Sequence, residues 1–120
     1  MPADHDTVIA DLKAEVAAFC EARDWDQFHG SKDLAIGIAT EAAELLELFR
    51  FATADDETAQ VTDPDARAST QAELADVLIF VLRFAQRFDI DLAGAVRAKL
   101  AENERRYPVD EARGSNRKAP

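Results

Sequence analysis

Apolar residues recur at helical spacing along four stretches of this chain, and no stretch shows the regular alternation of a β-strand. Glycine and proline are few, with four of each, and alanine is abundant, which also favours helix. We expect helices over about residues 6–23, 31–51, 64–88 and 92–106. The pattern therefore predicts an all-α fold, built as a four-helix bundle with short connections.

Capping signals leave two possible starts for the third helix. Asp63 followed by Pro64 is an N-cap with proline at the first helical position, and it predicts the earlier start. Thr70 with Glu73 also matches a capping box, which would give Glu73 a purely structural role. We expect the polar, acidic residues 53–62 to form a loop before this helix.

The third helix is apolar around most of its circumference. Its apolar residues are Leu74, Val77, Leu78, Ile79, Phe80, Val81, Leu82, Phe84 and Phe88. A helix of this kind is buried on nearly all sides. Because a chain of 120 residues can barely cover such a helix alone, we expect the protein to self-associate.

Two acidic pairs lie within the second and third predicted helices. Glu41 and Glu44 form one pair, and Glu73 and Asp76 form the other. The i, i+3 spacing puts both carboxylates of a pair on one helix face, among apolar residues where unpaired carboxylates are costly. Two such helices facing each other would hold magnesium, a hard cation that usually accompanies a phosphate substrate. The alternative interpretation is that the pairs are ordinary solvated acidic faces.

An aromatic cluster precedes the second helix. It consists of Trp25, Phe28 and His29. Such a cluster can be a hydrophobic staple at the helix entry, or a surface on which a nucleobase stacks.

The fourth predicted helix carries donors at related positions. Lys99, Asn103 and Arg106 recur on one face, and Tyr107 follows directly. These side chains would line that face with phosphate-binding groups, unless it is an ordinary solvated basic face.

Length, charge and cysteine content limit the class of protein. We expect one domain over residues 1–107 and a basic C-terminal tail over residues 108–120. The formal net charge of −10 makes polymeric nucleic acid an unexpected partner. The single cysteine, Cys20, suits a reducing compartment, and no apolar run approaches the roughly 20 residues of a membrane span. We therefore expect a cytoplasmic protein with no membrane partner.

Taken together, the acidic pairs resemble the signature of a known family. Glu41-Ala-Ala-Glu44-Leu and Glu73-Leu-Ala-Asp76-Val-Leu-Ile are similar to the ExxE…ExxD motifs of the all-α nucleoside triphosphate pyrophosphohydrolases, the MazG-like superfamily. Within it, the dCTP pyrophosphatase group is the most similar, through residues 23–29, 41–51, 73–80 and 99–108. The resemblance implies a MazG-like bundle completed by self-association, as a dimer or as a homotetramer that is a dimer of dimers.

The resemblance also implies roles for individual residues. The implied magnesium ligands are Glu41, Glu44, Glu73 and Asp76, and manganese could take the place of magnesium. The implied catalytic residues are Glu41, Glu44, Lys99 and Asn103, with either glutamate as the base that accepts a proton from water. The implied substrate-binding residues are Trp25, His29, Phe51, Phe80, Lys99, Asn103, Arg106 and Tyr107.

Three positions depart from the pattern of the dCTP group. Phe51 stands where that group usually has a second pocket tryptophan, and Phe80 stands where it usually has a tyrosine. Val16 stands where the vertebrate relatives carry a histidine. Phe51 retains a stacking surface, whereas Phe80 lacks the hydroxyl group that a tyrosine would offer as a hydrogen-bond donor.

The predicted function is magnesium-dependent hydrolysis of a nucleoside triphosphate. Cleavage between the α- and β-phosphates would give the monophosphate and pyrophosphate. We expect dCTP or a modified dCTP as the substrate, and cleaning of the nucleotide pool as the role. The alternatives are a non-catalytic helical interaction module and a related hydrolase that acts on another nucleotide.

Overall fold

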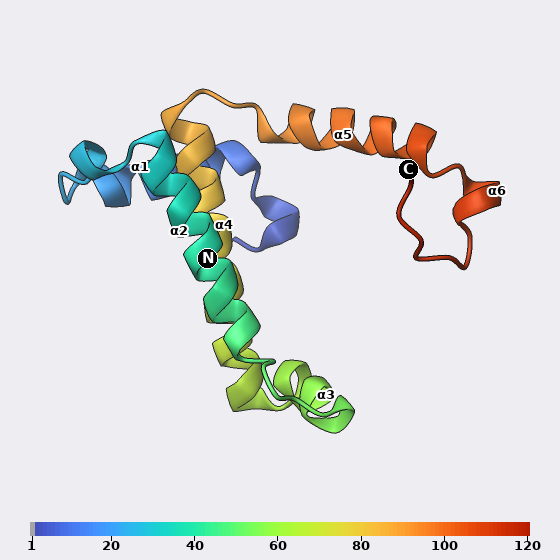
Figure 1. Cartoon of the computed structure of the whole chain (residues 1–120). Coiled ribbons are helices and arrows are strands. Elements are labelled where there is room, and N and C mark those ends of the chain that lie inside the picture. Colours follow the sequence, from blue (N-terminus) through green and yellow to red (C-terminus); the bar gives the residue numbers. More distant parts are fainter. Residues whose placement is uncertain (1) are drawn as a thin grey trace. The chain divides into compact units, whose positions relative to one another are not determined.

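The computed structural model describes residues 2–120, and all regular elements in that range are helical (Figure 1). The chain divides into two compact units, Met1–Asp89 and Ile90–Pro120. The N-terminal unit contains η1 (Asp4–Asp6), α1 (Ile9–Glu21), η2 (Asp26–Phe28), α2 (Ser31–Glu47), α3 (Ala54–Thr62) and α4 (Pro64–Arg87). The C-terminal unit contains α5 (Leu92–Arg106) and α6 (Val109–Ala112). The expectation of an all-α fold is confirmed.

The earlier of the two predicted starts for the third helix is the correct one. Asp63 caps α4 by accepting a hydrogen bond from the backbone amide of Ala66, at 3.2 Å, and Pro64 is the first helical residue. The rival capping box at Thr70 is wrong, because Thr70 lies inside the helix. Its hydroxyl group lies 2.9 Å from the carbonyl oxygen of Gln60 and joins α4 to α3.

The predicted loop at residues 53–62 is also wrong, because most of it forms α3. Thr53 and Asp56 make a reciprocal capping box, in which each side chain accepts from the other's backbone amide at 3.2 Å. The acidic residues of the first turn suit a helix N-terminus, where the helix dipole favours negative charge. The acidic composition that indicated a loop therefore stabilises a helix.

Two smaller boundaries differ from the prediction. α1 begins at Ile9, three residues later than expected, because Asp4–Asp6 forms a separate 3₁₀ turn and Val8 is extended. α2 ends at Glu47, and the chain then turns until Phe51, whose φ of 66° lies in the left-handed region. The basic tail contains the short helix α6.

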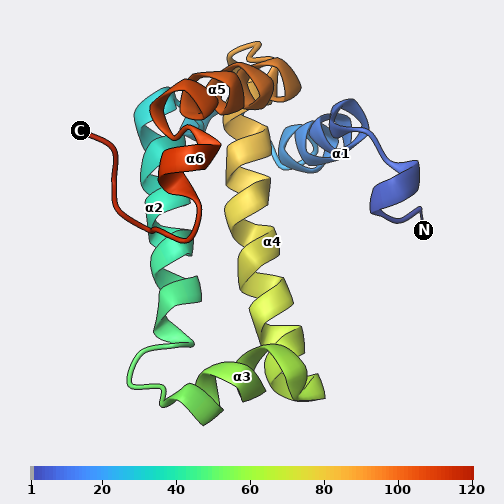
Figure 2. The ribbon, with the colours of Figure 1, turned by 90° about the vertical axis from the view of Figure 1, so that its right-hand side faces the viewer.

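The packed centre of the N-terminal unit is an antiparallel pair made by α2 and α4, with α1 and α3 lying against α4 (Figure 2). The buried apolar side chains are Cys20, Leu34, Leu82 and Ala85. Gly37 allows the two helices to approach closely, because a Cβ atom there would lie 2.3 Å from the Phe80 ring. This contact places Phe80 directly against the backbone of α2.

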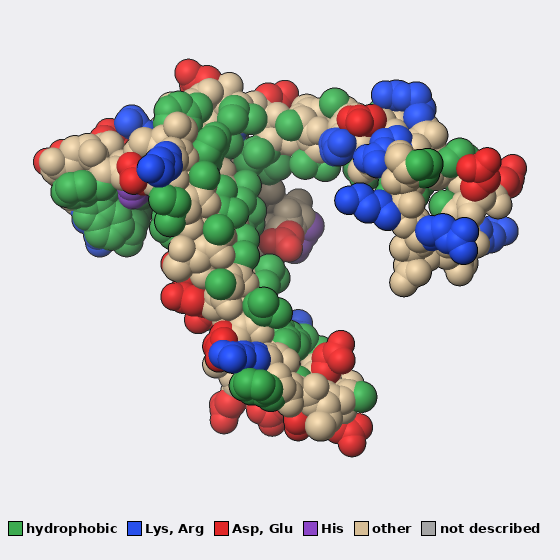
Figure 3. Space-filling view, in the orientation of Figure 1, with side chains coloured by type: hydrophobic (Ala, Val, Ile, Leu, Met, Phe, Trp, Pro, Cys, Tyr) green, Lys and Arg blue, Asp and Glu red, His purple; other side chains and the backbone are tan. Residues whose placement is uncertain are grey.

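Many apolar side chains of the N-terminal unit stay exposed. Leu74, on α4, is 56% exposed, and Leu78 and Ile79 beside it are also exposed. Figure 3 shows hydrophobic side chains along the α2–α4 pair and acidic side chains gathered around α3. The predicted burial of α4 on nearly all sides is therefore not reached within this unit. No helix within residues 2–120 is both long enough and apolar enough to cross a membrane.

Candidate functional site

Three of the four predicted metal ligands come together where α2 faces α4. Carboxylate oxygens of Glu41, Glu73 and Asp76 all lie within 4.8 Å of one another. One oxygen of Glu41 and one of Glu73, the Oε2 atom in each, are buried without a hydrogen-bond partner in the described chain. A buried carboxylate oxygen without a partner is costly, so this arrangement lacks a positive charge.

The pKa shifts within the cluster also indicate that a positive charge is missing. Burial raises the pKa of Glu41 above its ordinary value, and the neighbouring Glu44 raises it further. Burial also raises the pKa of Glu73, and the negative charges of Glu44 and Asp76 add to the effect. Glu44 lies outside the set of three, yet it is close enough to affect both other glutamates.

These residues fit a divalent cation. The donors are all oxygens, which hard cations prefer, and a cation would pair the two buried oxygens and relieve the repulsion that raises the pKa values. The i, i+3 spacing explains how Glu73 and Asp76 reach Glu41 together, since residues three apart on α4 share one helix face.

Phe80 lies one helical turn beyond this cluster. It follows Asp76 by four residues on α4, and it packs on Gly37, which precedes Glu41 by four residues on α2. Residues four apart in a helix share a face. An aromatic ring therefore lies one helical turn from the acidic cluster.

The predicted aromatic cluster forms around η2. The ring centroids of Trp25 and His29 are 6.2 Å apart, and those of Trp25 and Phe19 are 5.7 Å apart, both in edge-to-face contact. Trp25 remains 39% exposed, so its ring can still accept a stacking partner.

Phe51 does not join this group within one chain. It is 87% exposed at the far end of α2, with the Arg50 guanidinium group 4.7 Å from the centre of its ring. Trp25 precedes α2, whose 17 residues span about 25 Å. The two predicted stacking residues therefore lie at opposite ends of the helix.

Sequence reasoning missed Arg83, which holds η2 onto α4. Its side chain is 1% exposed, and it donates hydrogen bonds to His29 Nδ1 at 2.9 Å, to Gln86 Oε1 at 2.6 Å and to Asp26 Oδ1. The hydrogen bond from Arg83 lowers the pKa of Asp26 below its ordinary value. The available signal was an arginine within an apolar helix, since arginine is rarely buried without partners.

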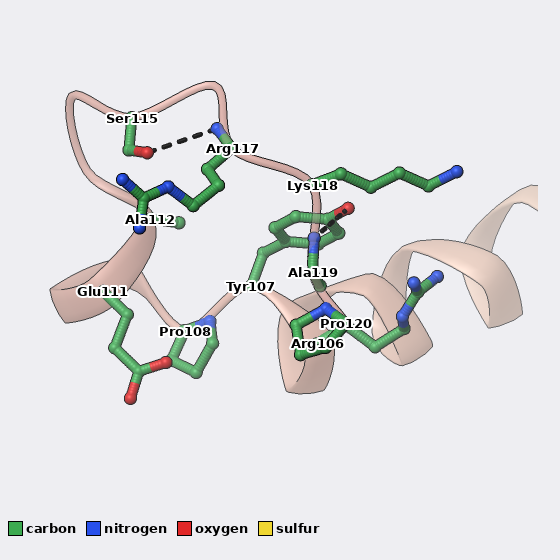
Figure 4. Close-up of a pocket in the computed structure, with 10 residues that line it drawn as sticks. All are labelled: Arg106, Tyr107, Pro108, Glu111, Ala112, Ser115, Arg117, Lys118, Ala119 and Pro120. Carbon is green, nitrogen blue, oxygen red and sulfur yellow. Dashed lines mark hydrogen bonds between the residues drawn. The ribbon is translucent and has the colours of Figure 1, made fainter.

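The predicted phosphate-binding residues lie in the C-terminal unit. Lys99 pairs with Glu102 at 3.2 Å on the exposed surface of α5, and Asn103 is half-buried. The Tyr107 hydroxyl group accepts a hydrogen bond from the Ala119 amide at 3.0 Å, so the tail folds back (Figure 4). Arg106, Arg117 and Lys118 surround the resulting hollow of about 290 Å³.

Comparison with known proteins finds relatives of this chain. The sequence profile of the MazG-like family matches residues 36–119. The chain is 41% identical over 110 residues to dCTP pyrophosphatase 1 of Homo sapiens, and 39% identical over 107 residues to that of Bos taurus. These matches cover 92% and 89% of this chain, which spans 65% and 63% of the two relatives' lengths.

The fold is similar to that of a solved protein. A pyrophosphatase from Archaeoglobus fulgidus DSM 4304 aligns with a TM-score of 0.76 and 33% sequence identity. The alignment covers 90% of this chain and 99% of that one. The profile match and the shared fold agree, and the chain belongs to the MazG-like family.

Proposed function

We propose that this protein is a magnesium-dependent nucleoside triphosphate pyrophosphohydrolase. The observation that carries the proposal is the cluster of Glu41, Glu73 and Asp76, with two buried oxygens that have no partner in residues 2–120. The names of the relatives, which are dCTP pyrophosphatases, support the same reaction class. The products would be a nucleoside monophosphate and pyrophosphate.

Glu41, Glu73 and Asp76 would hold the cation. When bound, magnesium would neutralise the triphosphate charge and lower the pKa of a coordinated water. Glu44 lies outside the three clustered carboxylates but is close enough to Glu41 and Glu73 to raise their pKa values. Glu44 is also exposed to solvent. Of the two glutamates predicted as bases, Glu44 is therefore better placed to accept the proton of the attacking water. A fourth-ligand role for Glu44 is the alternative.

The substrate would bind through its base and its phosphates. Trp25, Phe51 and Phe80 offer aromatic faces for a base, and His29 offers a ring nitrogen beside Trp25. The phosphates would bind the donors of the C-terminal unit, namely Lys99, Asn103, Arg106 and Tyr107. We propose dCTP or a modified dCTP as the substrate, on the similarity to the two dCTP pyrophosphatases, and nucleotide-pool cleaning in the cytoplasm as the role.

Self-association would complete the site. Trp25 and Phe51 lie at opposite ends of α2, so both can contact one base only if they come from different copies of the chain. The exposed apolar residues of α4, including Leu74 and Leu78, would then be covered. We propose a homotetramer arranged as a dimer of dimers.

Product analysis tests the proposal. The protein is incubated with magnesium and a panel of nucleoside triphosphates, beside the Glu44→Gln and Asp76→Asn variants. The control is Glu47→Gln, because Glu47 is an exposed residue on α2 that pairs with Arg50 at 3.6 Å, outside the cluster.

We expect pyrophosphate and a monophosphate from the wild type and from Glu47→Gln. Loss of a general base or of a carboxylate that holds the metal commonly reduces kcat by about 100-fold or more, so Glu44→Gln and Asp76→Asn should both be nearly inactive. Release of orthophosphate would mean that another bond is cleaved. A folded wild-type protein that turns over no triphosphate would remove the proposal.

A further inference from the structure

Arg83 is an unusual residue for the interior of a small helical unit. It occupies α4 one helical turn before Arg87, and its guanidinium group is almost completely buried. Each of its three nitrogens makes one hydrogen bond, to Asp26, to Gln86 and to the imidazole of His29. The ion pair with Asp26 balances the buried charge, so the bond to His29 needs its own explanation.

That bond determines where the imidazole carries its proton. A guanidinium group only donates, so His29 Nδ1, which receives a hydrogen bond from Arg83 Nε at 2.9 Å, must be unprotonated. In a neutral imidazole the proton is then on Nε2. A doubly protonated ring would direct an N–H group at the N–H group of Arg83.

The surroundings of His29 also favour the neutral ring. Burial lowers the pKa of His29, and the positive charge of Arg83 lowers it further. Arg87 acts in the same direction, whereas the carboxylates of Asp26 and Asp33 oppose it. The net direction of the pKa shift is downward, which favours the neutral form of the ring.

The remaining imidazole nitrogen is available to a ligand. His29 Nε2 makes no hydrogen bond within residues 2–120, and the ring is half-buried beside the partly exposed Trp25. A neutral N–H donor of fixed orientation next to an aromatic face suits a heterocyclic base, which combines a π-face with acceptor atoms at its edge.

We propose that Arg83 is a positioning residue, which sets His29 as a permanent hydrogen-bond donor to an acceptor atom of the substrate's base. In a cytosine nucleotide the acceptor would be a ring carbonyl oxygen or an unprotonated ring nitrogen. This inference rests on the proposed function for its substrate, but the state of the His29 ring is a property of the free protein. The two parts are therefore tested separately.

The ring state is measured by ¹⁵N NMR of the imidazole. The chain has two histidines, so a His5→Gln background leaves His29 as the only signal. We expect a neutral ring with the proton on Nε2. Arg83→Lys should give mixed tautomers, because a lysine ammonium group does not reproduce the guanidinium fork. A wild-type ring protonated on Nδ1, or charged at neutral pH, would overturn the proposal.

Arg87→Lys is the matched control. Arg87 lies one turn further along α4 and reaches the same segment, through the backbone oxygens of His29 at 3.4 Å and Asp26 at 3.5 Å, without touching the imidazole. It should leave the tautomer unchanged. A tautomer change of equal size in both variants would reduce Arg83 to a general anchor of η2 and contradict its specific role.

The substrate part is measured by steady-state kinetics with magnesium. The two probes are dCTP and the base-free deoxyribose 5′-triphosphate. Loss of one hydrogen bond should raise the KM for dCTP about three- to tenfold in Arg83→Lys, with little change in kcat. The KM for the base-free probe should not change. Equal effects on both probes would overturn the assignment to the base.

A second pair of variants keeps the test decisive if Arg83→Lys does not fold. His29→Gln retains an N–H donor at the position of Nε2, whereas His29→Ala removes it. We expect His29→Gln to keep a lower KM for dCTP than His29→Ala, and equal KM values would contradict the proposal. If the wild type cleaves no triphosphate, the proposed function fails, while the NMR result still decides whether Arg83 sets the tautomer.

Discussion

Glu41 and Glu73 are the residues whose ionisation the fold opposes, because burial and neighbouring carboxylates raise the pKa of both. A group whose pKa is higher in the folded state stabilises the fold below its unfolded pKa, which is about 4.5 here. That contribution is lost as the pH rises through the folded value. At neutral pH, each ionised carboxylate therefore weakens the metal-free protein.

The Glu73→Gln variant tests whether the ionised Glu73 carboxylate destabilises the metal-free protein. It should raise the melting temperature of the metal-free protein at about pH 7 and change it little at about pH 4. Calorimetry with a chelator present measures the melting temperature at each pH. Glu47→Gln is the control outside the cluster. Magnesium should stabilise the wild type more than Glu73→Gln. An equal shift at both pH values would show that ionisation is not the cause.

Gly37 is a second residue with a specific requirement, because a Cβ atom there would lie 2.3 Å from the Phe80 ring. We expect Gly37→Ala to destabilise the protein by about 1–3 kcal/mol through overpacking, despite the better helix propensity of alanine. Urea unfolding measures the change. In a Phe80→Ala background the clash is gone, so the same substitution should stabilise. A destabilisation of equal size in both backgrounds would exclude the ring contact as its cause.

At the scale of elements, α3 depends on its N-terminal cap. Thr53 and Asp56 satisfy each other's backbone amides, and Gln60 then ties α3 to Thr70 of α4 at 3.0 Å. Thr53→Ala should lower the free energy of unfolding by about 1 kcal/mol. Thr58→Ala, an exposed threonine inside the same helix, is the control, and denaturant unfolding compares the two. A similar loss from both variants would argue against the cap.

The elements also show how far the sequence could predict this structure. The ends of α5 and the cap at Asp63 were predictable, because proline and capping signals act within a few residues. The meeting of Glu41 with Glu73 followed from i, i+3 spacing on two apolar helices. α3 was missed because acidic residues suit both loops and helix N-termini. The pairing of Arg83 with Asp26 and His29 was not predictable, since these two partners lie more than 50 residues away along the chain.

At the scale of the whole molecule, the exposed apolar face of α4 predicts assembly. Light scattering should give about four times the chain mass of 13.2 kDa. Leu78→Glu puts a charge into this face, so it should yield a smaller, folded species with little triphosphate hydrolysis. Gln71→Glu adds the same charge on α4 without removing an apolar side chain, and it should keep the wild-type mass. A wild-type monomer with full activity would contradict the shared site.

Cys20, the only thiol in the chain, is 4% exposed near the end of α1, which packs against α4. A thiol reagent can reach its sulfur only while that packing is open, so the labelling rate reports how often α1 lifts from the rest of the unit. The labelling rate of this native cysteine is therefore a direct measure of local opening. It needs no engineered label, and it can be read in the presence of nucleotide to learn whether the substrate slows α1.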